Sequence, residues 1–129
     1  MAKFLTEDHM TAATEAMNND SGFQNAMTGK TLGLQFIVSD GPGGDIDYYL
    51  SIADGSAVMA LGSLDDADAS ITSDYETAQA LSSGELNVQM AFMTGKVKVG
   101  GNMATLMMNQ GLVNEFVRVQ SGLDLEFGG

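Results

Sequence analysis

The sequence predicts an α+β domain with one sheet that helices cover mainly on one face. Apolar residues repeat about every 3.6 positions near both ends of the chain, which is the helical period. Between residues 32 and 64 they mostly alternate with polar residues or glycine, as in strands. The expected order is helices, three strands, a fourth strand, helices, a fifth strand and a helix. With 129 residues, the chain can bury a core as one domain, so residues 1–129 are expected to form a single unit.

Two helices are expected ahead of the first strand. Residues 6–18 form the longer one, and the hydroxyl of Thr6 can accept a hydrogen bond from its first turn. Its apolar face consists of Met10, Ala13 and Met17. Ser21 is expected to cap a second, shorter helix, which Gly29 closes.

The next three elements are expected to be strands of an antiparallel meander. Alternating apolar residues run over 32–38 and 46–52, and a third strand is expected from Ser56 to Leu64. Glycine and proline in 40–44 predict the first loop. Asp54-Gly55 is a two-residue hairpin signal for the second loop.

The segment after the meander begins with a short strand and a helix. The strand is expected around Ile71. Ser73 and Glu76 form a capping box, in which each side chain can bond a backbone N–H of the first turn. This helix is expected to end at Gly84.

The remaining elements are two helices and one strand between them. Asn87 is expected to cap a short helix through Met93. Residues 96–99 alternate as the last strand, with the two valines inward and the two lysines on the other face. Asn102 is expected to cap the final helix, and Gly111 interrupts its apolar pattern where a kink or break is expected.

Composition excludes several classes of function. The formal net charge is −12, with 17 acidic and 5 basic residues, which is too few cations for nucleic-acid binding. The same charge limits contact with an anionic membrane to a transient one. No apolar run approaches the ~20 residues of a membrane-spanning helix, the first residues turn acidic before a signal-peptide core can form, and cysteine is absent. A cytoplasmic location is therefore expected.

No catalytic, metal or cofactor site is expected. His9 is the only histidine and is interpreted as a surface residue without a nucleophile beside it. A calcium loop starting at Asp65 would carry Ala67 and Ser70 where a ligand and a glycine are needed. The glycines of 41–44 precede a strand, whereas a phosphate-binding loop precedes a helix. The protein is therefore expected not to be an enzyme.

Methionine is unusually frequent, with 10 Met and 6 Phe but no Trp. Flexible thioether side chains can line a cavity that accommodates ligands of differing shape. Methionine at helical spacing also serves as ordinary core filling, so composition alone does not establish a cavity.

The segment from Gly84 to Met103 carries the most specific motif. It resembles the pattern G-x-x-N-P-Q-x-A-F-x-x-G-K-x-K-x-x-G-N-M of the sterol carrier protein-2 family. The matching residues are Gly84, Asn87, Gln89, Ala91, Phe92, Gly95, Lys96, Lys98, Gly101, Asn102 and Met103. Val88 departs from the pattern, which commonly has proline there. The resemblance extends over about residues 28 to 110.

This resemblance implies a five-stranded, mostly antiparallel sheet covered on one face by helices, with an apolar cavity between them. It also implies a non-catalytic carrier that binds one hydrophobic ligand, such as a fatty acid, fatty acyl-CoA, sterol or phospholipid. An accessory role beside an enzyme of lipid or quinone synthesis is the alternative, and the oligomeric state stays open. The expected ligand-binding residues are Phe92, Met93, Met103, Leu106, Met107, Leu112, Val113 and Phe116.

Overall fold

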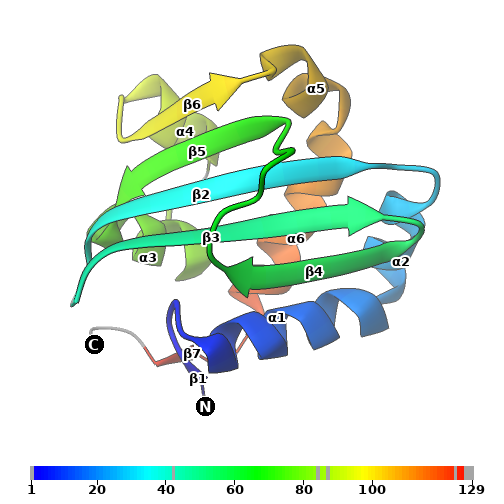
Figure 1. The fold of residues 1–129 in the computed structure, drawn as a ribbon, viewed down its shortest axis with the longest axis horizontal. Helices are drawn as coiled ribbons and strands as arrows, with labels where there is room; N and C mark the ends of the chain where they lie inside the picture. Colours follow the sequence, from blue (N-terminus) through cyan, green and yellow to red (C-terminus); the bar gives the residue numbers. More distant parts are fainter. Residues whose placement is uncertain (1, 42, 84, 87, 124, 127–129) are drawn as a thin grey trace.

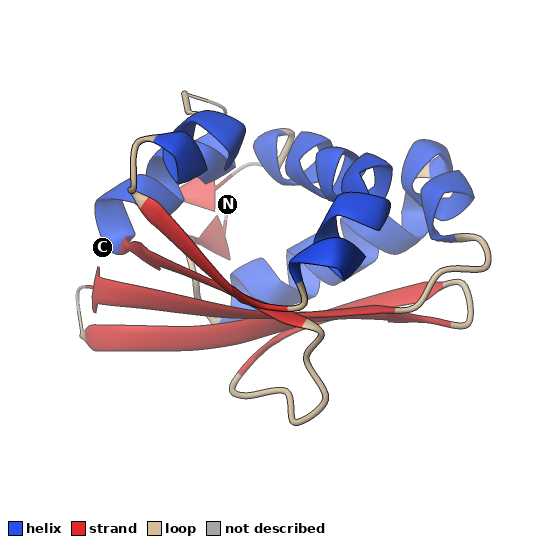
Figure 2. Cartoon of the chain, turned by 90° about the horizontal axis from the view of Figure 1, so that it is seen from above, coloured by secondary structure: helices blue, strands red, loops and turns tan. Residues whose placement is uncertain are grey.

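The fold consists of one sheet with helices packed against one of its faces (Figures 1 and 2). The computed structural model of the chain describes residues 2–41, 43–83, 85–86, 88–123 and 125–126. The sheet contains β2 (Leu32–Gly41), β3 (Gly44–Ala53), β4 (Ser56–Leu61), β5 (Ala69–Asp74) and β6 (Val97–Gly101). The helices are α1 (Glu7–Asn19), α2 (Ser21–Met27), α3 (Tyr75–Ser83), α4 (Val88–Met93), α5 (Met103–Met108) and α6 (Gln110–Ser121). The predicted α+β class is confirmed.

The strands lie in the order β4-β3-β2-β5-β6. The pairs β2–β3 and β3–β4 are antiparallel, which confirms the predicted meander. β5 joins β2 in parallel, and β6 then pairs antiparallel with β5. The parallel pair requires the chain to cross from β4 to the far side of β2 before β5 begins.

The turn between β3 and β4 has the conformation that its sequence predicts. Asp54 and Gly55 have φ values of 54° and 75°. Positive φ at both central residues is typical of a type I′ turn, which suits a two-residue hairpin. The turn sets the register in which Ala53 pairs with Ser56.

Two of the predicted helix caps are confirmed and two are wrong. The hydroxyl of Thr6 accepts from the N–H of His9 at 3.4 Å, and Oδ1 of Asn102 accepts from Thr105 at 3.1 Å. α2 is capped by Asp20 rather than Ser21, because the Asp20 carboxylate accepts from Phe23 at 2.9 Å.

The start of α3 also differs from the prediction. Asp74 accepts the N–H of Thr77 at 2.7 Å, whereas Ser73 is the buried penultimate residue of β5. The predicted capping box of Ser73 and Glu76 is therefore wrong, because the capping side chain is that of Asp74, one residue later. The predicted cap Asn87 and the predicted helix end Gly84 lie outside the described residues.

The final helical segment breaks at Asn109 rather than at Gly111. Asn109 ends α5 and precedes α6, with φ −109° and ψ 24°. Its side-chain amide donates to the carbonyl of Thr105 at 2.8 Å. Gly111 lies within the first turn of α6.

The two ends of the described chain pair with each other, which the sequence did not indicate. β1 (Ala2–Lys3) lies parallel to β7 (Leu125–Glu126) and forms a separate two-stranded sheet. The adjoining Phe4 and Leu5 are buried. The segment before α1 is therefore part of the core.

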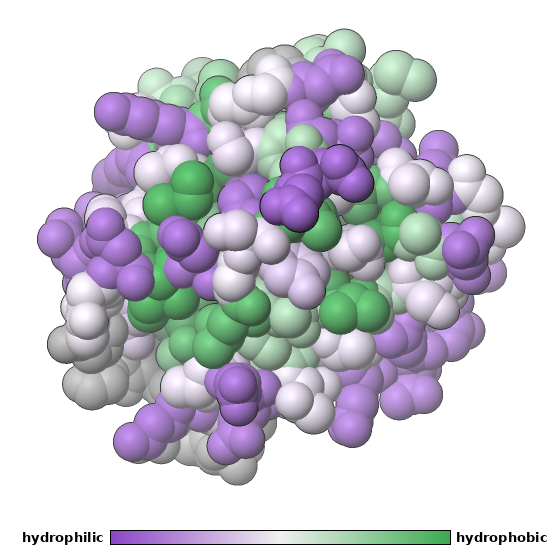
Figure 3. Space-filling model, viewed as in Figure 1, coloured by the Kyte–Doolittle hydropathy of each residue, from purple (hydrophilic) through white to green (hydrophobic). Residues whose placement is uncertain are grey.

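The core fills the space between the sheet and the helices. Alternate residues of β2 and β3, such as Leu34 and Leu50, point toward the helices and are buried. Figure 3 shows the opposite face, where hydrophobic groups are separated by hydrophilic ones. In β6, Val97 is buried and Lys98 is exposed, as expected. No helix in the described ranges is long and apolar enough to cross a membrane.

Candidate ligand-binding cavity

A cavity of about 80 Å³ lies between the sheet and the helices. Its sheet side is formed by Leu34, Phe36, Tyr48, Ile71, Ser73 and Val97. α3 contributes Ala78, Leu81 and Ser82, and α6 contributes Val113, Phe116, Val117 and Gln120. Phe4, His9 and Met59 complete the lining. All five strands of the main sheet and three helices thus contribute to the wall.

Aromatic rings form the centre of this wall. Phe36 and Tyr48 face each other across β2 and β3, with ring centroids 4.7 Å apart and an interplanar angle of 4°. Phe116 of α6 packs on the same Phe36 ring at 5.8 Å. Burial raises the pKa of the Tyr48 hydroxyl, so the side chain stays neutral. The cavity therefore has a stacked aromatic floor that holds α6 against the sheet.

His9 lies at one end of the cavity and is buried, so its interpretation as a surface residue is wrong. The N–H of Leu5 donates to Nδ1 of His9 at 2.9 Å. Because a backbone N–H can only donate, the ring proton is on Nε2, which lies 3.1 Å from Oε1 of Gln120. Burial lowers the pKa of His9, and the Gln120 hydrogen bond opposes that shift. The ring is a neutral, fully bonded group that joins α1 to α6.

The sequence held a partial signal for the burial of His9. Positions 9, 13 and 17 lie one turn apart on α1, and Ala13 and Met17 are also buried. Gln120 is 111 residues away, so no local pattern could have paired the two side chains.

The cavity lining holds no formally charged side chain among the residues described. Its polar members include Ser82, whose buried Oγ has no hydrogen-bond partner. Such a hydroxyl is destabilising unless it is bonded. The lining therefore includes a residue with an unbonded neutral hydroxyl and, among the residues described, no counter-charge for an ionic guest.

The expected ligand-binding residues separate into two groups. Val113 and Phe116 line the cavity, and Leu112 is buried on the same helix. Leu106 is partly buried against the core. Phe92, Met93 and Met107 are exposed by 46%, 80% and 73%, away from the described lining. The side chain of Met103 lies outside the described residues.

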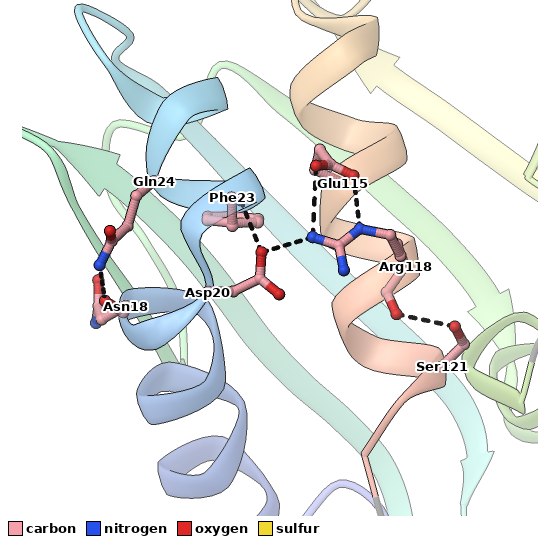
Figure 4. A network of polar contacts seen from close by, with 7 residues as sticks. All are labelled: Asn18, Asp20, Phe23, Gln24, Glu115, Arg118 and Ser121. Atoms are coloured by element: carbon pink, nitrogen blue, oxygen red, sulfur yellow. Dashed lines mark hydrogen bonds and ion pairs between the residues drawn. The ribbon is translucent and has the colours of Figure 1, made fainter.

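A polar network on the outer side of α6 also stabilises its observed position (Figure 4). Nη2 of Arg118 lies 2.6 Å from Oδ1 of Asp20, and its Nε lies 2.8 Å from Oε2 of Glu115. The Arg118 hydrogen bond lowers the pKa of Asp20, which also caps α2 through Phe23. One carboxylate thus couples the start of α2 to the helix that closes the cavity.

Comparison with known proteins agrees with this architecture. The model of the SCP-2 sterol transfer family matches residues 11–114. The chain belongs to this family. Sterol carrier protein 2 of Gallus gallus is 37% identical over 78 residues, which are 60% of this chain and 14% of that protein. The chain thus matches about one seventh of the length of this curated relative.

Solved structures of the SCP-2 sterol transfer family share the fold. A crystal structure of sterol carrier protein 2 has a TM-score of 0.80 at 22% identity, covering 95% of this chain and all of that one. The sterol carrier protein domain 2 of Helicoverpa armigera has a TM-score of 0.68 at 29% identity and covers 91% of this chain and 88% of that one. The similarity in fold therefore extends beyond the motif of residues 84–103 and includes the first helices and α6.

Proposed function

We propose that the protein is a non-catalytic carrier that binds one hydrophobic ligand between its sheet and helices. The observation that carries this proposal is the apolar, aromatic-floored cavity walled by Phe36, Tyr48 and Phe116. A structural neighbour from Aedes aegypti, with a TM-score of 0.61 and 17% identity, is described as palmitated. That description supports an alkyl chain as cargo. A cytoplasmic location stays a prediction.

The lining favours binding over catalysis. Both ring nitrogens of His9 are bonded within the protein, and the described lining has no carboxylate or ammonium group for acid-base chemistry. The portion of the ligand inside the cavity is uncharged, and any ionised headgroup stays outside. A hydroxyl or carbonyl group of the ligand can pair with Oγ of Ser82.

Loading requires the wall to move. Pockets for drug-sized ligands have about 300–1,000 Å³, several times the present cavity of about 80 Å³. We place the movement at α6, because Asn109 separates it from α5 and its inner residues Val113 and Phe116 cover the cavity. Each buried CH₂ contributes ~0.8 kcal/mol, so about 14 methylenes of an alkyl chain contribute roughly 11 kcal/mol. An immobilisation cost near the lower end of the ~4–15 kcal/mol range leaves micromolar affinity for such a chain.

The test is displacement of a fluorescent fatty-acid probe by palmitate and by a long-chain alcohol. Val113→Phe fills the cavity and is expected to reduce probe affinity at least about tenfold. Val58→Phe makes the same change on an exposed position of β4 and is expected to leave affinity unchanged. Equal affinity for both folded variants, or no lipid in native mass spectra of the gently purified protein, contradicts the proposal.

An accessory role beside a biosynthetic enzyme is the second candidate function. It is supported by a structural neighbour named UbiJ-SCP2 ubiquinone synthesis protein, with a TM-score of 0.56 and 14% identity. That likeness concerns the fold alone. Co-purification of one biosynthetic enzyme, together with an empty cavity in native mass spectra, would favour this role over the carrier.

A further inference from the structure

One end of the cavity is closed by three side chains that meet around His9. Phe4, His9 and Gln120 all line the cavity, and they are exposed by only 5%, 1% and 6%. Phe4 follows β1, His9 belongs to the first turn of α1, and Gln120 belongs to the last turn of α6. Figure 1 shows β1 beside the start of α1, and the ring centroids of Phe4 and His9 lie 5.4 Å apart.

The backbone at Leu5 depends on the His9 ring. Leu5 has φ 59°, in the left-handed region that leucine rarely adopts. Its N–H donates to Nδ1 of His9 at 2.9 Å, and the residue is buried, so water does not replace this bond. The Thr6 hydroxyl supports the same turn by donating to the carbonyl of Lys3 at 2.6 Å. The segment that carries Phe4 into the cavity wall therefore depends on one unprotonated ring nitrogen.

Protonation of the ring changes only one of its two hydrogen bonds. Nε2 already carries a proton and remains the donor to Oε1 of Gln120, which lies 3.1 Å away. Nδ1 becomes a second donor that faces the N–H of Leu5, so the two groups repel each other and the buried N–H loses its acceptor. The loss therefore falls on Leu5 and the segment before it, while the bond to α6 survives.

The groups that pack around His9 from other elements are neutral. β4 contributes Met59, whose sulfur lies 3.8 Å from Nε2 of Gln120. Tyr75 of α3 packs on Phe4. Burial raises the pKa of Tyr48 in the same cavity, so that phenol carries no charge.

The charged side chains of the surrounding elements are exposed to solvent or paired with each other. They are Lys3 of β1, Glu7 and Asp8 of α1, and Glu115 and Arg118 of α6. The side chain of Glu126 in β7 lies outside the described residues. Burial outweighs the Gln120 hydrogen bond and lowers the pKa of His9 below its ordinary value.

We propose that His9 is an acid-sensitive switch, whose protonation opens the β1 end of the cavity and lowers the affinity for hydrophobic cargo. This inference rests on the proposed carrier function and names its regulation. Cargo beside His9 removes further water from the ring, so binding disfavours the protonated form. Because linkage is reciprocal, protonation weakens cargo binding by the same factor. With one titrating group, the Kd rises by at most about tenfold per pH unit.

The experiment measures the Kd of a pyrene-labelled long-chain alcohol between pH 7.5 and 5. An alcohol is the probe because, unlike a fatty acid, it does not titrate in this range. In the unchanged protein the Kd is expected to rise at least about fivefold as the pH falls below about 6.5. Near-UV circular dichroism is expected to show intact packing at each pH. Probe release that coincides with loss of this signal would indicate global unfolding and overturn the switch.

Hydrogen exchange provides a readout that does not require cargo. The protection of the Leu5 N–H, relative to an unstructured peptide at the same pH, is expected to fall as the pH is lowered. The N–H of Leu50, in a central strand of the sheet, is the internal control and is expected to keep its protection. Unchanged protection of Leu5 over this range would contradict the switch.

Two substitutions shift the titration in different ways. His9→Gln keeps a donor and an acceptor but takes up no proton, so its Kd is expected to stay within about twofold across the range. Gln120→Glu places a carboxylate beside Nε2, which stabilises the charged ring and moves the rise in Kd to higher pH. Gln110→Glu is the matched control, because it adds the same charge at an exposed position of α6, and its pH profile is expected to be unchanged.

The switch is wrong if the Kd of the unchanged protein does not depend on pH, if His9→Gln shows the same rise, or if Gln120→Glu and Gln110→Glu share one profile. Probe binding at pH 7.5 with any of these results leaves the carrier function intact. A probe that binds at no pH would instead contradict the carrier function. In that case, loss of Leu5 protection at acid pH would still support the conformational switch at His9.

Discussion

Asn18 of α1 occupies the place of a neighbouring strand for Ala57 of β4. Its Oδ1 accepts from the Ala57 N–H at 2.9 Å, and its Nδ2 donates to the Ala57 carbonyl at 2.8 Å. One turn earlier, the hydroxyl of Thr14 bonds both the N–H and the carbonyl of Met59, at 3.0 and 3.2 Å. Two helical side chains thereby satisfy the outward backbone groups of an edge strand, which would otherwise invite pairing with another chain.

Asn18→Ala is expected to lower the free energy of unfolding by about 1–3 kcal/mol, because it leaves one backbone donor and one acceptor of Ala57 without partners. Urea denaturation measures this change, and size-exclusion chromatography is expected to show new self-association. Asn19→Ala, on the next and exposed position, is the control with a much smaller effect. Equal losses in the two variants would contradict the role of Asn18.

The stability of the protein is expected to fall as the pH drops below about 6.5. The pKa of His9 is lowered in the folded state, so the unfolded chain takes up the proton first and is favoured. The loss is complete below the folded pKa. Protonation also places an N–H on Nδ1, facing the N–H of Leu5. Urea midpoints measured between pH 5 and 8 for His9→Gln and for the unchanged protein isolate this contribution. If the midpoint depends on pH equally in both proteins, the prediction is wrong.

Gly101→Ala is expected to destabilise the fold by about 1–3 kcal/mol or more. Gly101 has φ +82°, and a methyl group there would lie 2.8 Å from the carbonyl oxygen of Asp68 and 2.9 Å from Cα of Ala69. Gly111→Ala is the matched control, because a methyl group there meets nothing within 4 Å and Gly111 lies in a helix. It is expected to stabilise the protein by about 0.4–1 kcal/mol. Thermal melts of the two variants should shift in opposite directions.

Ser82→Ala is expected to stabilise the ligand-free protein by about 1 kcal/mol, because it removes a buried hydroxyl without a partner. The same change is expected to weaken binding of a long-chain alcohol. Ser83→Ala is the neighbouring control, since its hydroxyl is exposed and bonds the carbonyl of Ala80. Unchanged alcohol affinity in Ser82→Ala would show that the hydroxyl does not contact the ligand.

The sheet was predictable because its signals are local. Period-two alternation and the Asp54-Gly55 turn need only a few adjacent residues. The helix caps were harder to predict from sequence. Asp20 and Ser21 can both accept a hydrogen bond from a backbone N–H, and the local sequence does not show at which of the two the helical backbone begins. The crossing from β4 to the far side of β2 had no local signal.

The cavity was only partly predictable, because its wall combines distant residues. Val113 and Phe116 could be placed on one helical face, but Phe36, Tyr48 and His9 join them only through the sheet and α1. Met93 and Met107 have the polarity of core residues, yet α4 and α5 leave them at the end of the sheet, where no other described element covers them. The hydrophobicity of a residue predicts that its side chain tends to be buried, but it does not predict which other element covers that side chain.

The pairing of β1 with β7 has a consequence for the order in which the chain assembles. The meander closes through short loops, whereas residues 2 and 125 must meet across almost the whole length of the described chain. Closing such a long loop carries a larger entropic penalty, and non-local contacts slow folding. During ribosomal synthesis, Gln120 reaches His9 only after nearly every other element has emerged. We therefore expect the nascent chain to become able to hold cargo only after α6 and β7 have been synthesised and have met α1 and β1.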